Sequence, residues 1–396
     1  MNKLFYMSNA LDDVTRLERC ITSDSPAASR KIFLLCEAMR KSNVRAVVIS
    51  MGRGKQDGSG RYFRCIVRRI NGIPVIYLPF LHLPILSELV SLFAIAPVLC
   101  HLYFKRGTKA VLFYNRMPAY LLGLVMARLL GFKTLLDLED GEILQEKSLF
   151  RSLKSKFFSW FFDAFCSGGA ILACNALENN TGLRPTYCCY GTSETSALLS
   201  SQNTTPVCIL LSGTVSSDTG GQLLVDVIQM LREESPTWAN NIQFEITGKG
   251  DCMSQFQCLA ENVKTPIVTV HGRITNNEYH QMLTRTQVGL ALKPNSGKLA
   301  NTTFPSKVIE FASHRILVVS TDISDVRKVL SNGAIYLTND DPQLLIDKLR
   351  WIVENREQAN NLALRGARAV NLTCAPEKVG LMLKQFIFDP SILVNK

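Results

Sequence analysis

The sequence lacks the cysteine and histidine spacings that mark metal centres and disulfide frameworks. Its 12 cysteines include no C-x-x-C pair, and its five histidines show no ligand spacing. Several cysteines, such as Cys36, Cys174 and Cys208, lie inside apolar runs, where cysteine behaves as a small core residue. We therefore expect no zinc site, no disulfides and a reducing, cytoplasmic environment.

The sequence also lacks an uninterrupted apolar run of the ~20 residues that a membrane-spanning helix needs. The nearest candidate is 76–104, which is interrupted by several residues, including Pro79, Pro84, Glu88 and Pro97. One interpretation is a loop followed by a buried helix of the first domain. The other is a surface that dips into the inner leaflet of a membrane, aided by Lys105, Arg106 and Lys109.

No helix-turn-helix, RNA-recognition or zinc-finger signature accompanies the positive charge, so we expect no nucleic-acid partner. The chain has 44 Lys and Arg against 33 Asp and Glu, a formal net charge of +11. This balance favours an anionic partner, such as a phosphorylated small molecule or an anionic membrane surface.

Alternating apolar runs and helical patterns predict two α/β domains. At 396 residues the chain suits two domains of about 150–200 residues each. The polar stretch 192–206 is the best linker candidate, so we place the domains at 1–200 and 201–375. The last residues, 376–396, include a helix that we expect to pack back on the first domain. Strands that alternate with helices predict a parallel, doubly wound sheet in each domain.

The most informative stretch of the second half is FPSKVIEFASHRILVVSTD, residues 304–322. Ser306 is a candidate helix cap, 307–313 a short helix and 316–319 a buried strand. Lys307 and Glu310 lie on that helix. Ligands of doubly wound sheets bind at the carboxyl ends of strands, so we expect both side chains to face a ligand.

The clearest unit of the first half is a strand at 110–114, a helix at 117–130 and a strand at 134–138. Such short joints predict a right-handed parallel crossover. The second of these strands ends in DLED, residues 137–140, and Asn115 and Arg116 follow the first. The aromatic and basic stretch 147–164 is either a core helix or a second membrane-facing surface.

The second half resembles the C-terminal domain of GT-B glycosyltransferases, in particular family GT4. The resemblance rests on ILLSGTVSSDTGGQLLVDVI, FEITGKGD, VTVHGRITNNEYHQML, VGLALKP and FPSKVIEFASHRILVVSTD, in this order. These motifs cover about half the chain, and FYNRMPAYLLGLVMARLLGFKTLLDLED extends the likeness more weakly into the first half. The resemblance implies a GT-B fold, in which two Rossmann-like doubly wound domains face an interdomain cleft.

The resemblance places Glu310 on the ribose of a nucleotide-sugar donor, and Lys307 on its phosphate or sugar. The alternative is that neither residue binds a ligand: Glu310 would form a local cap or ion pair, and Lys307 would be a solvated lysine of the first turn. The first acid of the family's E-x7-E pattern falls at Thr302, and its diphosphate-binding Arg and Lys fall at Thr214 and Thr219. The remaining donor-site candidates come from glycine turns, substitute cations and the helix start: Gly213, Gly248, Lys249, Arg273 and Ser306.

Many family members carry a histidine beyond the strand at 134–138, where this chain has Glu139 and Asp140. We treat both carboxylates as catalytic candidates that bind the acceptor or the donor sugar, and expect Asp137 to be structural. The alternatives are an acidic loop paired with lysines, or a D-x-D metal site. The two-domain layout argues against a metal, and we expect no cofactor. Asn115 and Arg116 are acceptor-binding candidates.

The resemblance thus implies a glycosyltransferase (a hexosyl or related transferase) that uses a nucleotide-diphosphate sugar, with retention of configuration. The expected acceptor is a polysaccharide or a polyprenyl-diphosphate-linked saccharide, met at the inner face of the plasma membrane. Because Thr214 and Thr219 replace two cations, a catalytically weak saccharide- or partner-binding subunit is the first alternative. A nucleotide-sugar epimerase of the same fold is the second.

Overall fold

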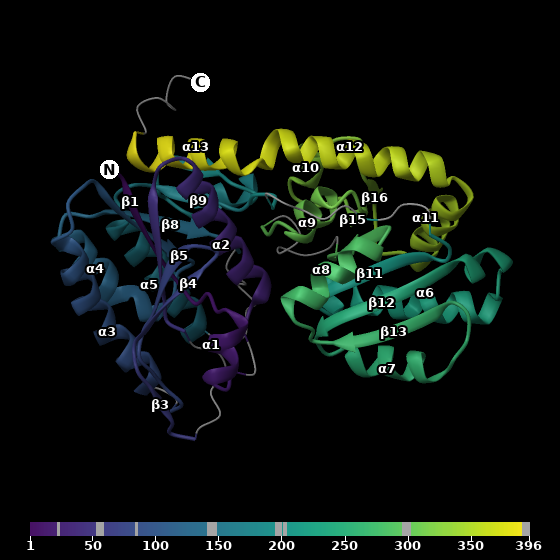
Figure 1. Ribbon diagram of the computed structural model, residues 1–396, viewed down its shortest axis with the longest axis horizontal. Helices are drawn as coiled ribbons and strands as arrows, with labels where there is room; N and C mark the ends of the chain where they lie inside the picture. Colours follow the sequence, from purple (N-terminus) through teal and green to yellow (C-terminus); the bar gives the residue numbers. More distant parts are fainter. Residues whose placement is uncertain are drawn as a thin grey trace. The chain divides into compact units, whose positions relative to one another are not determined.

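The computed structural model describes residues 1–21, 24–52, 59–83, 86–140, 149–194, 200, 204–294 and 302–389 (Figure 1). It divides into two compact units: unit 1 is Met1–Thr192 with Pro376–Lys396, and unit 2 is Ser193–Ala375. The boundary was predicted at residue 200, and the two units divide between Thr192 and Ser193. Ser193 belongs to unit 2, because its N–H and hydroxyl donate to the carbonyl of Cys374 at 2.9 and 3.2 Å. Of the predicted linker, residues 195–199 and 201–203 lie outside the described residues.

Within the described part of unit 1, eight strands form one sheet in the order β10-β9-β8-β7-β1-β2-β5-β4. The strands are β1 (Lys3–Ser8), β2 (Arg45–Ser50), β4 (Ile66–Ile70), β5 (Ile73–Tyr77), β7 (Lys109–Tyr114), β8 (Lys133–Leu138), β9 (Ala170–Leu172) and β10 (Thr186–Cys188). Neighbours are parallel except β4 and β5. Two short strands, β3 (Tyr62–Phe63) and β6 (Phe80–Leu81), pair separately. The central strands are continuous apolar runs because helices cover both faces.

The helices of unit 1 form two groups. The group against β2 contains α2 (Pro26–Lys41) and α13 (Pro376–Phe388), which pack on each other. Gly380 permits this approach, because a Cβ there would lie 2.0 Å from the carbonyl oxygen of Ala38. The other group contains α3 (Leu86–Tyr103), α4 (Leu121–Leu129) and α5 (Leu149–Phe165), with α3 and α5 each packing on α4. Shorter helical segments complete the unit: α1 (Asp13–Glu18), η1 (Pro118–Tyr120) and η2 (Asn175–Asn180).

The stretch 76–104 contains β6 and α3, and α3 is only half buried. Ile95 and Leu99 are fully buried, whereas Phe93 is 63% exposed, so the expectation of a buried helix is half right. The stretch 147–164 forms most of α5, although residues 147 and 148 lie outside the described residues. Among the described helices, none is long and apolar enough to cross a membrane.

Within the described part of unit 2, six strands form a fully parallel sheet in the order β13-β12-β11-β14-β15-β16. They are β11 (Val207–Thr214), β12 (Ile242–Lys249), β13 (Ile267–Gly272), β14 (Val288–Ala291), β15 (Leu317–Thr321) and β16 (Ile335–Leu337). The helical segments are η3 (Ser217–Thr219), α6 (Gly221–Glu234), η4 (Thr237–Asn241), α7 (Met253–Glu261), α8 (Asn276–Arg285), α9 (Lys307–Ser313), α10 (Val326–Leu330), α11 (Pro342–Glu354) and α12 (Arg356–Cys374).

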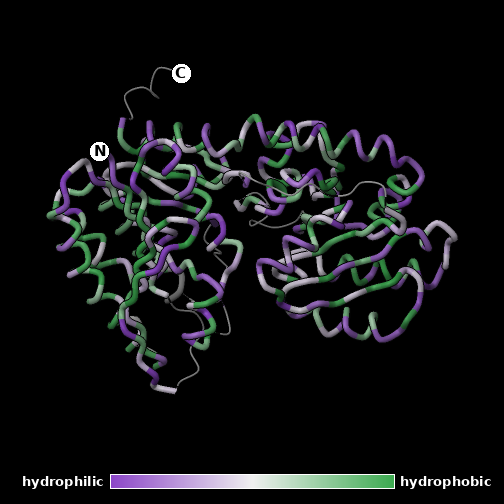
Figure 2. The backbone as a smooth tube through the Cα atoms, in the orientation of Figure 1, coloured by the Kyte–Doolittle hydropathy of each residue, from purple (hydrophilic) through white to green (hydrophobic). Residues whose placement is uncertain are grey.

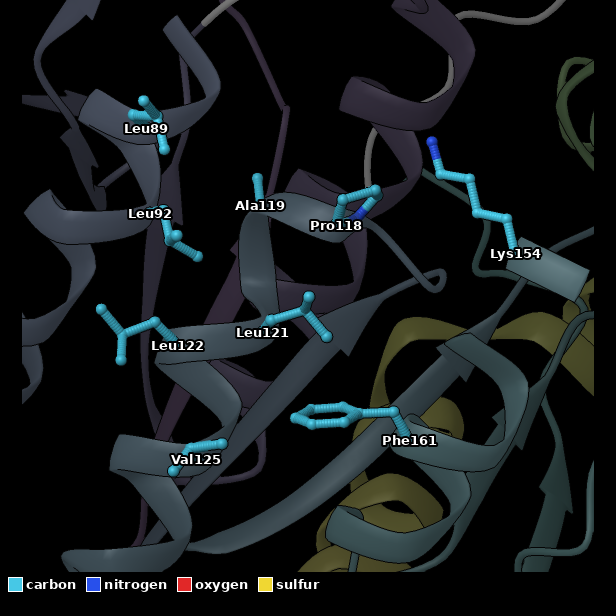
Figure 3. A pocket seen from close by; sticks show the side chains of 9 residues that line it. All are labelled: Leu89, Leu92, Pro118, Ala119, Leu121, Leu122, Val125, Lys154 and Phe161. Carbon is cyan, nitrogen blue, oxygen red and sulfur yellow. The ribbon is translucent and has the colours of Figure 1, made fainter. Parts of the chain in front are cut away.

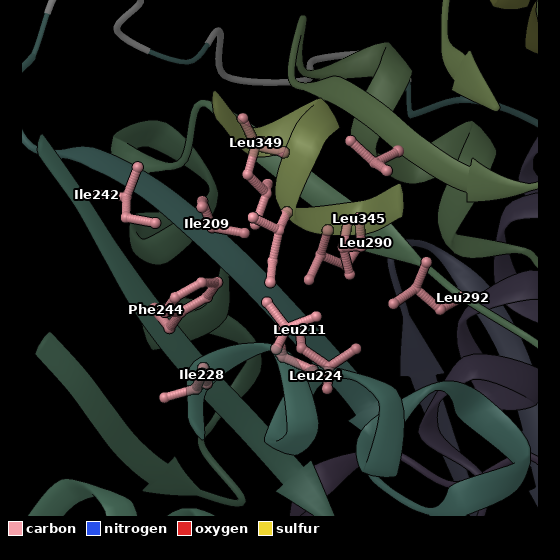
Figure 4. Packing of buried hydrophobic residues seen from close by; sticks show 14 of the residues in the cluster. Ile209, Leu211, Leu224, Ile228, Ile242, Phe244, Leu290, Leu292, Leu345 and Leu349 are labelled. Atoms are coloured by element: carbon pink, nitrogen blue, oxygen red, sulfur yellow. The ribbon is translucent and has the colours of Figure 1, made fainter. Parts of the chain in front are cut away.

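The core of unit 2 lies between its sheet and helices α6 and α11. Ile209 and Phe244 from the strands meet Ile228 of α6 and Leu345 and Leu349 of α11 (Figure 4). Hydrophobic residues are concentrated along the strands of both sheets (Figure 2). Burial of this apolar surface supplies the main driving force for folding, and it fixes where the polar strand ends emerge.

Candidate functional site

The candidate donor site lies in unit 2, where the direction of strand order reverses. From β11 the chain proceeds outward through β12 and β13, and then crosses back to β14 on the other side of β11. Parallel doubly wound sheets bind ligands at this switch point, outside the carboxyl ends of the strands. The carboxyl end of β11 carries Gly213 and Thr214, both exposed.

Two glycines form the floor at this edge. Gly248 of β12 pairs in register with Gly213 of β11, and both have positive φ, +135° and +107°. A Cβ on Gly248 would lie 1.8 Å from the carbonyl oxygen of Gly213, so a side chain is excluded there. The backbone of both strand ends therefore remains accessible at short range, as phosphate binding requires.

Helix α9 is held close to this floor by another glycine, in β14. A Cβ on Gly289 would lie 2.3 Å from the ring of Phe311, so the absent side chain lets α9 lie directly on the strand. Val308, Phe311 and Ala312 are fully buried on that side. One turn of helix then directs Lys307 and Glu310 toward the switch point, and the Lys307 stem lies 3.6 Å from where a Cβ on Gly213 would be.

Lys307, Glu310 and Tyr279 form one hydrogen-bonded group. Lys307 Nζ lies 2.5 Å from Glu310 Oε2, and the same ammonium donates to Tyr279 Oη at 2.9 Å. Tyr279 Oη donates to Glu310 Oε2 at 3.0 Å and lies 3.1 Å from Ser212 Oγ. The side chains of Lys307 and Glu310 are 21% and 10% exposed, so both are largely buried but keep some contact with solvent.

The phenol of Tyr279 stays neutral in this group. Burial and the Glu310 carboxylate together raise the pKa of Tyr279 to about 12, although Lys307 opposes them. The Lys307 ammonium also lies 4.5 Å from the centroid of the Tyr279 ring, a cation–π distance. Tyr279 therefore acts as a hydrogen-bonding bridge between the lysine and the glutamate.

Thr214 and Thr219 stand where the resemblance to GT4 enzymes leads us to expect an Arg and a Lys, and the two threonines have different environments. Thr219 Oγ1 donates to the Thr214 carbonyl at 2.6 Å and accepts from Ser216 N–H at 3.0 Å. Its hydroxyl thus closes the loop between β11 and α6, and it is only partly exposed. Thr214 is exposed at the strand end.

The other predicted donor-site residues are spread along the same edge. Lys249 ends β12 opposite Thr214, and Arg273 follows β13, two strands away from β11. Ser306 is exposed and occupies the predicted N-cap position of α9, but its side chain makes no capping hydrogen bond. Its φ and ψ are already helical, and its carbonyl instead accepts from Ile309 N–H at 3.2 Å.

In unit 1, Glu139 lies in a buried group of charges at the carboxyl edge of the sheet. It forms an ion pair with Lys31 of α2, with side chains only 15% and 8% exposed. Burial and the neighbouring Asp137 raise the pKa of Glu139 to about 8, although Lys31 opposes them. Burial alone would lower the pKa of Lys31, but Glu139 and Asp137 outweigh it and the pKa is raised. One ammonium thus faces two carboxylates.

Asp137 and Asn115 hold this group in place. Asp137 is fully buried and accepts a hydrogen bond from Tyr6. Asn115 has a left-handed φ of +56°, its N–H donates to the Asp137 carbonyl at 2.7 Å, and its side chain accepts from Glu139 N–H at 2.8 Å. Asn115 therefore ties the ends of β7 and β8 together.

Asp140 and Arg116 lie beside this group. Asp140 is exposed and lines a pocket of about 270 Å³ with Asn115, Arg116, Leu138, Ser155 and Phe158. Arg116 is 5% exposed, and its guanidinium donates to Asp163 at 3.1 Å and to the Asn180 carbonyl at 2.9 Å. Arg116 therefore links α5 to η2, and its predicted acceptor role stays a prediction.

Three site residues, Tyr279, Lys31 and Lys293, were not predicted from the sequence. Tyr279 and Lys31 lie on helices far along the chain from their partners, and only the tertiary fold brings them there. Lys293 follows β14 and donates to Thr303 Oγ1 at 2.8 Å, which adds a cation to the switch-point edge. Tyr279 had one available signal: it falls on the buried face of α8 with Met282 and Leu283, and a buried phenol needs a partner.

The described residues include no group of three or more His, Cys, Asp or Glu that could hold a metal ion. The D-x-D interpretation of 137–140 therefore gains no support from the arrangement of these carboxylates. The expectation of metal-free chemistry stays a prediction.

Comparison with known proteins finds a family match within unit 2. Residues 206–355 match the family described as glycosyl transferases group 1. No curated protein sequence matches the chain.

Solved structures match both units. Sucrose-phosphate synthase from Thermosynechococcus elongatus has a TM-score of 0.69 at 12% identity, covering 100% of each chain. Anabaena HepE in complex with UDP and glucose has a TM-score of 0.68 at 14% identity, covering 98% of this chain and 100% of its own. A trehalose 6-phosphate synthase from Burkholderia multivorans has a TM-score of 0.62 at 9% identity, covering 100% and 99%.

At these identities the structural likeness shows the fold, and the family match covers most of unit 2. The two Rossmann-like units with parallel sheets are those of the GT-B fold. Residues 206–355 match the glycosyl transferases of group 1, and the chain is a glycosyltransferase of the GT-B fold.

Proposed function

We propose that this glycosyltransferase moves a sugar from a nucleoside-diphosphate donor to a polysaccharide or a polyprenyl-diphosphate-linked saccharide, with retention of configuration, as in family GT4. The observation that carries the donor side is the Lys307–Glu310–Tyr279 group at the switch point of the group 1 domain. The Glu310 carboxylate is held between an ammonium and a phenol, next to strand ends that carry Gly213 and Gly248. This arrangement suits a ligand with hydroxyls and phosphates.

On the donor, Glu310 accepts hydrogen bonds from the ribose hydroxyls. Lys307 and Tyr279 orient this carboxylate, because both donate hydrogen bonds to it. The diphosphate lies over Gly213 and Gly248, with Thr214, Thr219 and Ser306 at its rim. Its charge is offset by Lys307, Lys249, Lys293 and Arg273, which replace the cations missing at 214 and 219.

In the reaction, the bond between the anomeric carbon and the diphosphate oxygen breaks, and the diphosphate leaves with the electron pair. A hydroxyl oxygen of the acceptor bonds to the anomeric carbon, and the proton of that hydroxyl passes to the leaving diphosphate oxygen. Stabilising the leaving diphosphate with fixed cations lowers the barrier, and we propose that no metal or other cofactor is needed.

Unit 1 supplies the acceptor side in this proposal. Asp140 is exposed in its pocket beside Asn115, so it is the better placed carboxylate to accept a hydrogen bond from an acceptor hydroxyl. Glu139 is engaged with Lys31 and acts on the acceptor through the position of Asp140 and Asn115. The enzyme works in the cytoplasm, at the inner face of the membrane that carries the lipid-linked acceptor.

Thermal-shift titration against UDP-, GDP- and dTDP-sugars tests the donor side. UDP-sugars come first, since HepE was solved with UDP and with UDP-glucose. We expect one class to raise the unfolding temperature and Glu310→Ala to abolish the shift. Glu354→Ala is the matched control and should keep the shift, because Glu354 is an exposed glutamate of α11 that pairs with Arg350 of the same helix.

The loop at Thr214 and Thr219 favours one alternative, a saccharide- or partner-binding subunit with little catalytic activity. The Thr219 hydroxyl is committed to the loop, so this position supplies no charge to a diphosphate. Donor binding without release of nucleotide, with any acceptor offered, would favour this alternative. Isomerised free sugar without transfer would instead indicate an epimerase.

A further inference from the structure

Helix α3 has an inverted distribution of polar and apolar side chains. Its inward face carries Ser87, Ser91, Ile95 and Leu99, all fully buried. Large apolar side chains face outward instead: Leu86 is 47% exposed, Leu89 43% and Phe93 63%. A surface helix normally presents its polar residues to water, so this outward face is built for a partner that is not water.

Helix α5 presents a similar stripe on the same side of the sheet. Leu153, Phe157 and Trp160 are 62%, 48% and 63% exposed, at the spacing of one helix face. The aromatic rings contact one another, with centroids of Phe157 and Trp160 6.1 Å apart. A tryptophan at the edge of an apolar surface is typical of membrane interfaces.

A groove of about 600 Å³ lies between these helices and α4. Figure 3 shows Leu89 and Leu92 of α3 facing Leu121, Leu122 and Val125 of α4, with Phe161 of α5 pointing toward them. Lys154 is the one charged residue among the described residues that line it. Its volume falls within the ~300–1,000 Å³ of ligand sites, and its lining suits hydrocarbon.

The groove adjoins the proposed acceptor pocket. Lys154 at its rim lies 5.9 Å from the ring centroid of Phe158, which lines the pocket with Asp140 and Asn115. Pro118 of the groove follows Arg116 of the pocket by two residues. A hydrocarbon chain in the groove would therefore end close to the polar pocket.

The charges around the apolar surface are complementary to anionic headgroups. Lys154, Lys156 and Arg128 are exposed on α5 and α4, and Lys105 and Arg106 follow α3. These three helices contain two acids, of which Asp163 is paired with Arg116 and Glu88 lies in the first turn of α3. Basic residues close to an anionic leaflet are attracted to its headgroups.

We propose that the outward face of α3, α4 and α5 docks on an anionic lipid bilayer, and that the groove between them takes a lipid hydrocarbon chain. Leu86, Leu89, Phe93, Leu153, Phe157 and Trp160 enter the interface, while the lysines meet the headgroups. The helices lie on the membrane rather than across it. This inference rests on the proposed function, because a lipid-linked acceptor is what brings the enzyme to a bilayer.

Trp160 provides a native probe. The chain has three tryptophans, and Trp238→Phe with Trp351→Phe, both in unit 2, leaves Trp160 alone. Phosphatidylcholine vesicles with phosphatidylserine should shift its emission to the blue and carry the protein upward in a density gradient at low salt. Vesicles of phosphatidylcholine alone should bind at least tenfold more weakly.

Variants separate the lipid surface from the fold. Phe93→Asp with Phe157→Asp should weaken vesicle binding at least tenfold, and Lys154→Glu with Lys156→Glu should remove its dependence on phosphatidylserine. Leu372→Asp with Leu381→Asp, exposed leucines of α12 and α13, is the matched control and should bind as the wild type does. Because all these positions are exposed, the unfolding temperature should be unchanged.

The outcomes distinguish this inference from the proposed function. Donor binding with no flotation and an unmoved Trp160 emission overturns the lipid surface and leaves the transferase intact. Flotation without binding of any nucleotide sugar sinks the proposed function and leaves the lipid surface intact. If Phe93→Asp with Phe157→Asp instead converts a dimer to a monomer in sedimentation, the surface is a self-interface and the lipid proposal is wrong.

Discussion

Lys307 and Glu310 lie one turn apart on α9, with the ammonium 2.5 Å from carboxylate Oε2. The pair lies at the edge of the sheet rather than on an open surface, because Gly213 and Tyr279 flank it. An i, i+3 pair on an exposed helix contributes only ~0.2–0.5 kcal/mol. Its value here is therefore placement: it fixes a carboxylate and a cation where phosphates and hydroxyls of a donor would arrive.

Lys307→Met should weaken binding of the nucleotide sugar about tenfold or more, because the variant loses a cation at the diphosphate and a donor to Glu310. Isothermal titration measures the affinity directly. Lys264→Met, an exposed lysine far along the chain, is the control and should leave the affinity unchanged. An affinity of the Lys307→Met variant equal to the wild type would contradict the proposed donor site.

Tyr279→Phe should reduce donor affinity by a smaller factor and destabilise unit 2 by about 1 kcal/mol. The variant removes the hydroxyl that bridges Lys307, Glu310 and Ser212 but keeps the ring under the ammonium. Urea unfolding gives the stability and titration gives the affinity. If neither changes, the phenol is a bystander and the hydrogen-bonded group lacks the importance assigned to it.

Gly248→Ala should destabilise unit 2 by several kcal/mol, because its Cβ would lie 1.8 Å from the Gly213 carbonyl and φ is +135°. Gly272→Ala is a matched control: its φ is +62°, but nothing lies within 4 Å of the added Cβ. We expect the control to cost about 1–2 kcal/mol from backbone strain alone. Equal losses in the two variants, measured by chemical unfolding, would show that the close strand contact is unimportant.

The buried pair in unit 1 predicts a pH dependence of stability. The pKa of Glu139 is raised from 4.5 to about 8, mainly by burial, so the folded chain binds this proton more tightly than the unfolded chain. The resulting stabilisation is complete below about pH 4.5 and is lost as the pH rises through 8. The unfolding temperature should therefore fall across this window.

Glu139→Gln should flatten that fall, because the glutamine carries no titrating proton. Scanning calorimetry from pH 5 to 8.5 on both proteins makes the comparison. Glu178→Gln, a half-exposed glutamate of η2, is the control and should keep the wild-type slope. A parallel fall in the wild type and in Glu139→Gln would assign the pH dependence to other groups.

Hydrophobic periodicity, together with the glycine and proline residues that interrupt it, predicts most elements of the fold. Continuous apolar runs predict β1, β7, β8 and β11, because a strand buried on both faces has little choice of residues. Helix α9 begins and ends where the sequence indicates, between Pro305 and His314. The short strands β3 and β6 and the first helix, α1, were missed, since two to six residues carry too little pattern.

The candidate site could be predicted only in part. The sequence identifies Lys307 and Glu310 because their helix follows a series of strand and glycine-turn motifs in the second half of the chain. It does not show that Thr219 is committed to its own loop, or that Arg116 is bound to Asp163. Both facts depend on distances between side chains, which hydrophobic periodicity does not encode.

The sequence by itself determined the class of fold and the chemistry offered at the strand ends, because strand and helix periods, glycine turns and charge are local properties. Only the tertiary structure decided which polar side chains form hydrogen bonds or ion pairs with each other. It brings Tyr279 of α8 onto Glu310 of α9 and Lys31 of α2 onto Glu139 after β8. Such pairings arise from the packing of whole helices against a sheet, and no local pattern specifies which polar side chains meet there.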